Sequence, residues 1–205
     1  KKLNLGAKHA SGDYLMFLND DTEVISEDWL ENMLQLVQRK EVGAVGAKLI
    51  YENNTIQHGG VTFSNGLPDH IFKGKYKDDP GYFFNLVTNR NYLAVTGAAM
   101  ITKKSDFDLV KGFEEKFKIN YSDIDYCLKL YYNLNLRCVF AGASALYHYE
   151  SASREATVDQ YEIDLFEKRW KINNDPYYNE KIFSTKYPSY NIDNKKNKMY
   201  RMLVQ

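Results

Sequence analysis

Three adjacent polar residues follow the first apolar run of the chain. Asn19, Asp20 and Asp21 come directly after residues 14–18, which read YLMFL. Neighbouring carboxylates repel each other, and their oxygens suit hard cations such as Mg²⁺ or Mn²⁺. Mg²⁺ usually takes one or two protein carboxylates and completes its shell with phosphate oxygens and water. The triplet therefore indicates a phosphate-bearing substrate, although on its own an ordinary solvated turn is the better interpretation.

A second pair of carboxylates, Asp123 and Asp125, lies at the start of a predicted helix. Positions i and i+2 point to different faces of a helix, so one acid can face a cleft while the other caps or pairs. We predict Asp123 as a general base, whose reach to a hydroxyl is a matter of geometry. Asp125 has the ordinary interpretation of a helix cap.

A third group begins at His148, which follows an apolar run and precedes Ser151, Ser153 and Arg154. A lone histidine is more often structural than a ligand. Arginine, however, presents a planar fork of donors that suits a diphosphate. Each of the three groups is a weak signal when it is taken alone.

The elements that must position these residues alternate between strands and helices. Hydrophobic periodicity predicts helices over 1–10, 26–40, 122–134 and 157–171, a helical turn over 106–110, and strands over 13–18, 42–51, 60–64, 94–102, 137–141 and 145–148. Ser26 is the predicted N-cap of its helix, and 65–90 is predicted to be a long loop. This alternation predicts an α/β sheet with ligands at the carboxyl ends of its strands.

Composition excludes some classes of function. With 27 basic and 27 acidic residues the chain has no net charge, which argues against bulk attraction to nucleic acid. Cys127 and Cys138 form no metal-binding or disulfide pattern, so we expect reduced, buried thiols and a cytoplasmic protein. No apolar run approaches the length of a membrane span. A peripheral position at the inner face of a membrane stays open.

The order of the motifs resembles the family 2 glycosyltransferases of the GT-A fold, especially the bacterial branch that builds O-antigen, capsule or rhamnose-rich polysaccharide. The resemblance covers roughly 1–180 and rests on "NLGAKHASGDYLMFLNDDTEV", "WLENML", "VGAVGAKLIY", "IQHGGV", "VTGAAMITKKSDFDLVKGFEEKF", "YSDIDYCLKL", "LYHYESASR" and "DPYYNE". It implies a Rossmann-like mixed sheet with helices on both faces.

The resemblance also implies a domain organisation. Residues 1–175 are similar to the C-terminal two-thirds of a GT-A domain, and 176–205 would form an extended polar tail. The strands that grip the nucleotide base would precede Lys1, so we expect a piece of a longer polypeptide. The isolated chain is then expected to be weakly active or inactive, and its cut sheet edge could self-associate.

The resemblance assigns the donor side of the site. Asp21 would bind the divalent metal, Mg²⁺ or Mn²⁺, and His148 would complete the metal site. Asn19 or Asp20 would lie near the ribose and phosphates of a nucleotide-diphosphate sugar, and Arg154 would face the diphosphate. Asn19 departs from a strict D-x-D motif.

The resemblance makes Asp123 the catalytic base, although Ser122 departs from the usual glutamate before it. The remaining assignments lie on the acceptor side of the cleft. They are Gly97, Ala98, Gly112, Phe113, Asp125, Gln57 and His58. Lys111 and Glu114 depart from the usual form of the turn around Gly112.

The implied activity is a metal-dependent, inverting transfer of a hexosyl or deoxyhexosyl group. The acceptor would be a hydroxyl of a growing cell-surface polysaccharide or a lipid-linked glycan. The alternative is a sugar- or partner-binding module that kept the fold and lost catalysis. A metal phosphohydrolase would need a denser cluster of ligands than the four histidines supply.

Overall fold

A mixed β-sheet forms the centre of the molecule, and the computed structural model describes residues 1–64, 66–149 and 159–179. Within these residues the sheet has seven strands in the order β1-β8-β3-β9-β2, with β4 beside β3 and β7 beside β9. The strands are β1 (Tyr14–Leu18), β2 (Thr22–Val24), β3 (Val42–Ile50), β4 (Ile56–His58), β7 (Arg90–Tyr92), β8 (Ala99–Lys103) and β9 (Arg137–His148). A separate hairpin pairs β5 (Val61–Ser64) with β6 (Leu67–His70).

The strands β3 and β9 are parallel, and the other strand pairs of the described sheet are antiparallel. Every residue of β3 is buried, as expected for a central strand that is covered on both faces. The register of β9 shifts where Ala141 and Ala145 oppose successive residues of β3. The two strands predicted over 137–141 and 145–148 are therefore one strand that contains a bulge.

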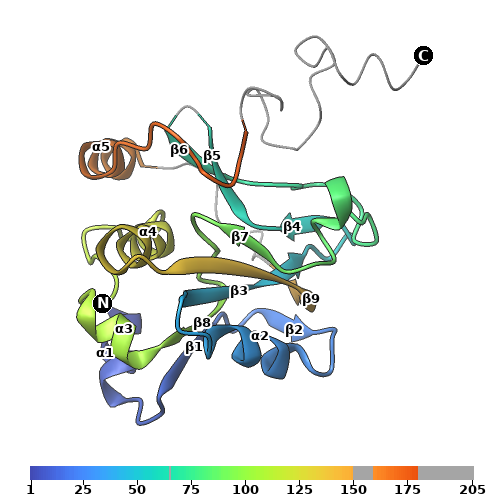
Figure 1. Cartoon of the computed structure of the whole chain (residues 1–205), viewed down its shortest axis with the longest axis horizontal. Helices are drawn as coiled ribbons and strands as arrows, with labels where there is room; N and C mark the ends of the chain where they lie inside the picture. The colour runs from blue at the N-terminus through green and yellow to red at the C-terminus, as the bar shows by residue number, and fades with distance from the viewer. Residues whose placement is uncertain (65, 150–158, 180–205) are drawn as a thin grey trace.

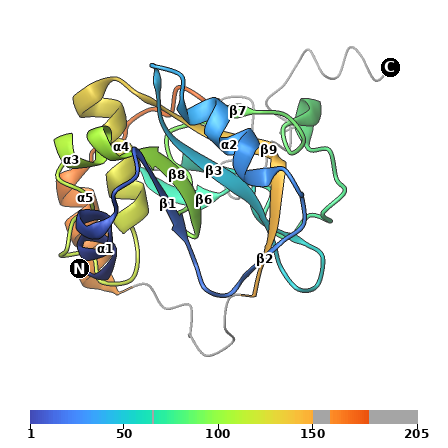
Figure 2. The ribbon, with the colours of Figure 1, turned by 90° about the horizontal axis from the view of Figure 1, so that it is seen from below.

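Helices cover both faces of the sheet (Figures 1 and 2). On one face α2 (Trp29–Val37) packs in a core with Val45 and Val139. On the other face α4 (Ser122–Leu134) packs in a second core with Ala44 and Cys138. The helices α1 (Lys2–His9), α3 (Lys104–Leu109) and α5 (Gln160–Arg169) add residues to this second core. The predicted α/β class with helices on both faces is confirmed.

Several local predictions were wrong. The helix predicted over 26–40 begins at Trp29, and the Ser26 hydroxyl accepts a hydrogen bond from the backbone N–H of Ala145 instead of capping the helix. The loop predicted over 65–90 contains β6, the start of β7 and the short 3₁₀ helix η1 (Tyr82–Phe84). These elements, like β2 and β4, have only three or four residues, which is too short for a periodic pattern to show.

Both cysteines are free and buried, as predicted. Burial raises the pKa of the Cys127 thiol well above its ordinary value, which keeps it protonated and unreactive. Among the described residues, no helix is both long enough and apolar enough to cross a membrane.

The centre of β3 leaves no room for a side chain at Gly46. A Cβ atom there would lie 2.5 Å from the Cβ of Val95, so Gly46→Ala should lower the free energy of unfolding by about 1–3 kcal/mol. The matched control is Gly6→Ala in α1, where a Cβ meets no atom within 4 Å. That change should raise the free energy by up to about 1 kcal/mol. Urea denaturation measures both, and an unchanged midpoint for Gly46→Ala would contradict this packing.

Candidate active site

Four side chains from three segments meet at the carboxyl ends of β1 and β9. The Nε2 atom of His148, the last residue of β9, lies 3.0 Å from Asp21 Oδ1 and 3.0 Å from Asn19 Nδ2. Its Nδ1 atom lies 2.6 Å from Oε1 of Gln57 on β4. The register explains the meeting, because β2 pairs with β9 so that Thr22 opposes His148 and Asp21 arrives beside it.

The hydrogen bonds define which nitrogen of His148 carries a proton. Gln57 Oε1 can only accept, so Nδ1–H donates to it and Nε2 presents its lone pair. Asn19 Nδ2 can donate to that lone pair, and Asp21 Oδ1, which is buried and has no hydrogen-bond partner among the described residues, lies at the same 3.0 Å from Nε2. Two electron-rich atoms at this separation are stabilised when a cation lies between or beside them.

The donor set fits a divalent metal. The carboxylate oxygen suits Mn²⁺ or Mg²⁺, and the imidazole nitrogen favours the transition metal Mn²⁺ of the two. The amide of Gln57 would orient the imidazole from behind. The described residues contain no group of three or more His, Cys, Asp or Glu side chains that could hold a metal. Asp21 and His148 would therefore be a two-residue set, with the remaining positions left for phosphate oxygens and water.

The other predicted donor-side residues have simpler surroundings. Asp20 is exposed at the same turn as Asp21. The backbone N–H of Asn19 donates to the carbonyl of Ala98 at 2.9 Å, which fixes the turn against the segment before β8. Arg154 lies outside the described residues, and its contact with a diphosphate stays a prediction.

Asp123 lies at the start of α4 and is held by backbone donors. Its Oδ2 accepts from the N–H of Gly97 at 2.7 Å, and its Oδ1 accepts from the N–H of Ile124 at 2.9 Å. A Cβ on Gly97 would come within 3.0 Å of the Asp123 Cβ, so glycine permits this approach. Since Ala98 binds Asn19, residues 97–98 connect the predicted base to the acidic turn.

His58 is adjacent to Gln57 but makes different contacts. Its Nδ1 lies 2.9 Å from His70 Nδ1, and its Nε2 accepts a long hydrogen bond, 3.5 Å, from the N–H of Thr96. Burial, and secondarily the charge of His70, lower the pKa of His58 well below its ordinary value. His58 is therefore a neutral, fully buried residue next to the segment that contacts Asp123.

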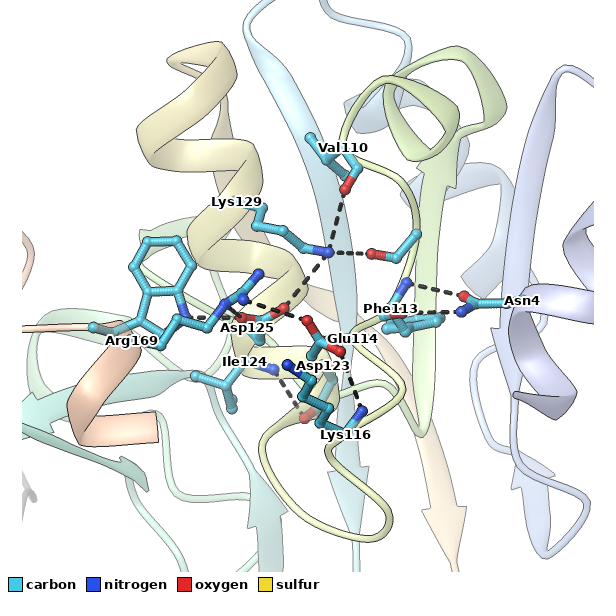
Figure 3. A network of polar contacts seen from close by, with 12 residues as sticks. Asn4, Val110, Phe113, Glu114, Lys116, Asp123, Ile124, Asp125, Lys129 and Arg169 are labelled. Atoms are coloured by element: carbon cyan, nitrogen blue, oxygen red, sulfur yellow. Dashed lines mark hydrogen bonds and ion pairs between the residues drawn. The ribbon is translucent and has the colours of Figure 1, made fainter. Parts of the chain in front are cut away.

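Asp125 has no exposed surface, which argues against the acceptor-side position predicted for it. Its carboxylate pairs with Arg169 at the end of α5, accepts from the indole N–H of Trp170 at 2.9 Å, and lies 3.5 Å from Lys129. Figure 3 shows Arg169 and Lys129 both reaching this carboxylate. The two acids at the start of α4 thus have different environments, as their i, i+2 spacing indicated.

Gly112 and Phe113 are buried, and both line a hollow of about 590 Å³. The carbonyl of Gly112 accepts from the ammonium of Lys129, and the backbone of Phe113 exchanges two hydrogen bonds with the side chain of Asn4 (Figure 3). The Phe113 ring packs against Phe17 in the core. Both residues support α4 and α1 in this structure, and a role toward an acceptor stays a prediction.

The sequence reasoning missed Glu162, a buried carboxylate on α5. It accepts hydrogen bonds from the backbone N–H groups of Lys118, Ile119 and Asn120 and from the amide of Asn120. Its exposed fraction is 2%. The spacing i, i+4 to buried Phe166 was a signal, because it places Glu162 on the core-facing side of α5.

The hydrogen bonds to Glu162 hold the segment that leads into Asp123. Tyr121, which precedes α4, adopts a left-handed backbone with φ 63°, and its ring stacks on Phe166 of α5 at 4.9 Å. Helix α5 thus contacts the chain on both sides of the predicted base. Its Glu162 binds the backbone before Asp123, and its Arg169 pairs with Asp125 after it. We infer that the docking of α5 positions Asp123.

Comparisons with known proteins bear on the family and the fold of the chain. A family model described as "Glycosyl transferase family 2" matches residues 1–107. The chain is 39% identical over 197 residues to "Uncharacterized protein y4gI" of Sinorhizobium fredii (strain NBRC 101917 / NGR234), an alignment that covers 87% of this chain and 21% of that protein. It is 37% identical over 190 residues to "O-antigen biosynthesis protein RfbC" of Myxococcus xanthus, covering 89% of this chain and 15% of that protein.

The chain therefore spans about a fifth or less of the length of these curated relatives. Among solved structures, GalNAc-T7 with UDP, GalNAc and Mn²⁺ has a TM-score of 0.54 at 12% identity, over 71% of this chain and 29% of that chain. This likeness shows the fold.

Replacing Glu162 tests the link between α5 and the segment before Asp123. Glu162→Gln replaces one acceptor oxygen by an amide donor that faces two hydrogen-bond donors, so it should lower the free energy of unfolding by about 1.5–3 kcal/mol at pH 7. Glu167→Gln, an exposed position on the same helix, is the control and should change little. Equal effects of the two variants in urea denaturation would contradict the role of Glu162.

The loss should also depend on pH. Burial raises the pKa of Glu162, but the hydrogen bonds from Ile119 and Asn120 outweigh it and hold the pKa below its ordinary value of 4.5. Because the folded-state pKa is the lower one, the stabilisation is complete above about pH 4.5 and is lost as the pH falls through the folded-state value. The difference between wild type and Glu162→Gln should therefore shrink in acid.

Proposed function

Because the chain belongs to glycosyl transferase family 2, we propose that it forms the metal-binding and base-bearing part of an inverting sugar transferase. The donor is a nucleotide-diphosphate sugar, and the transferred group is a hexosyl or deoxyhexosyl residue. One observation carries the proposal: the Asp21–His148 pair and Asp123 are joined through the backbone of residues 97–98. A metal ligand set and a base in one framework are what such a transfer requires.

Asp21 Oδ1 and His148 Nε2 would hold Mn²⁺ or Mg²⁺, whose charge offsets the negative charge on the departing diphosphate. Gln57 keeps the imidazole in the tautomer that offers Nε2 as a ligand. The solved structure of GalNAc-T7 contains UDP and Mn²⁺, which supports a nucleotide diphosphate and Mn²⁺ as the molecules bound here. Arg154 would add a guanidinium fork to the diphosphate.

Asp123 acts as the base. The N–H groups of Gly97 and Ile124 hold its carboxylate in place, and each oxygen keeps a lone pair that can receive a proton. The acceptor hydroxyl oxygen attacks the anomeric carbon while the bond from that carbon to the diphosphate oxygen breaks. The electron pair of that bond leaves with the diphosphate, the hydroxyl proton passes to Asp123, and the single displacement inverts the anomeric centre.

The acceptor is a hydroxyl of a growing cell-surface polysaccharide or a lipid-linked glycan. The similarity to an O-antigen biosynthesis protein supports this acceptor class. Transfer would take place in the cytoplasm, where nucleotide sugars are available, with 1–175 as the catalytic unit and 176–205 as a polar tail.

Metal-dependent nucleotide binding is the first test. In titration calorimetry of the protein with UDP and dTDP, binding should require Mn²⁺. In Asp21→Asn or His148→Gln, binding of the nucleotides in the presence of Mn²⁺ should be lost. Gln57→Leu should weaken Mn²⁺ binding about ten- to a hundredfold, because the imidazole loses its orienting partner. Asp28→Asn, which removes a charge at a position without a side-chain cap bond, is the control. Nucleotide binding that is equally tight with and without Mn²⁺ in the wild type and in every variant would favour the inactive binding module.

Sugar transfer by the full-length polypeptide tests the base. Asp123→Asn keeps the shape of the side chain but cannot accept the proton, so kcat should fall about 10²–10⁴-fold while nucleotide binding is unchanged. The anomeric configuration of the product, read by NMR, should be opposite to that of the donor. A product of retained configuration would overturn the single-displacement mechanism.

A further inference from the structure

A hollow rich in arginine lies at the end of the sheet opposite the candidate active site. Its volume is about 510 Å³, and Arg39, Arg90 and Arg137 line it together with Asn89 and Asn91. No carboxylate is among the residues that line it. A pocket of this size and composition is within the range of small-molecule sites.

Two of these arginines lie on paired strands, although the register does not place them opposite each other. Arg137 begins β9, and Arg90 begins β7, which pairs with β9 from Arg90 opposite Phe140. Arg39 follows α2, and the N–H of Arg137 donates to the carbonyl of Glu41 at 2.8 Å, which ties that turn to β9. The guanidinium groups therefore extend from a fixed framework.

The hollow is separate from the Asp21–His148 pair. Arg137 opposes Val42, and Tyr147 opposes Ile50, at the two ends of the parallel register. Eight residue steps along β3 at about 3.3 Å each place the ends roughly 26 Å apart. A diphosphate bound beside His148 cannot reach these arginines.

Glu41 balances only part of the positive charge around the hollow. Among the described residues, the side chains of Arg39 and Arg90 have no ion pair or hydrogen bond, and Glu41, at 2.8 Å from Nη2, is the ion-pair partner of Arg137. The Nε atom of Arg137 is buried without a hydrogen-bond partner. Buried donors on a charged group normally have an acceptor, so an acceptor from outside the described residues is expected.

The negative end of the α2 dipole offers a simpler explanation for Arg39 alone. Cations are favourable near a helix C-terminus, and Arg39 lies two residues past Val37, the last residue of α2. Arg90 and Arg137 lie on strands, so the helix dipole does not account for their convergence.

We propose that this hollow binds a phosphate-bearing ligand. The planar guanidinium forks match phosphate oxygens in a bidentate manner, and the amides of Asn89 and Asn91 add neutral donors. The hollow is larger than one phosphate group needs, so the phosphate is carried by a larger molecule, either a soluble sugar or nucleotide phosphate or a lipid headgroup. The site is independent of the proposed transfer activity.

Calorimetric titration with inorganic pyrophosphate, in low salt and with EDTA to leave the metal site empty, tests the soluble form of the ligand. Pyrophosphate should bind saturably and more weakly as salt is added. Arg90→Gln and Arg137→Gln should each weaken binding about tenfold, the effect of one lost charge-assisted hydrogen bond. Lys40→Gln, an exposed cation beside Arg39 that does not line the hollow, is the matched control and should bind normally.

Flotation with vesicles tests the lipid form. Vesicles of phosphatidylcholine with 20% phosphatidic acid, an amount chosen as roughly that of an anionic membrane surface, should retain the protein if the ligand is a headgroup. Loss of retention in Arg90→Gln and Arg137→Gln but not in Lys40→Gln would identify that source. The proposal is overturned if neither probe binds, or if the control loses as much binding as the arginine variants, because bulk charge would then explain the result.

Discussion

The parallel pairing of β3 with β9 is the constraint on which the rest of the structure depends. β3 is buried along its whole length and cannot shift without exposing one of two cores. Its register with β9 determines the position of His148, the last residue of β9. The pairing of β2 with β9 then places Asp21 beside His148. The imidazole and carboxylate of the candidate metal site are thus placed by sheet register over more than one hundred residues of chain.

Burial and the number of nearby donors give chemically similar carboxylates different roles. Glu162 and Asp125 are buried and engaged by several donors each, and they hold helix to loop and helix to helix. Asp21 and Asp123 are partly exposed and keep accepting capacity that the protein does not use up. A carboxylate held between two cations, as Asp125 is between Arg169 and Lys129, has a structural role, whereas one without such partners is available to a metal or a proton.

The sequence predicted the elements whose type follows from the pattern of their own residues. β1, β3 and α4 have long apolar patterns, and the structure places them within a few residues of the expected bounds. It could not predict the contact of Gln57 with His148, because the three-residue strand β4 has no pattern and 91 residues separate the partners. It likewise could not predict that Asp125 is buried, because that depends on Arg169 arriving from α5.

Composition gives the net charge of the chain but not how the fold distributes the charges in space. Equal numbers of acidic and basic residues argue against bulk attraction to polyanions, but the fold separates the charges locally. One end of β9 gathers a carboxylate and an imidazole lone pair, which favour a cation, and the other end gathers three guanidinium groups, which favour an anion. Both ends leave a buried polar atom unpaired, Asp21 Oδ1 and Arg137 Nε. Buried polar groups usually have a hydrogen-bond partner, so both atoms are consistent with the proposed cation at one end of β9 and the proposed anion at the other.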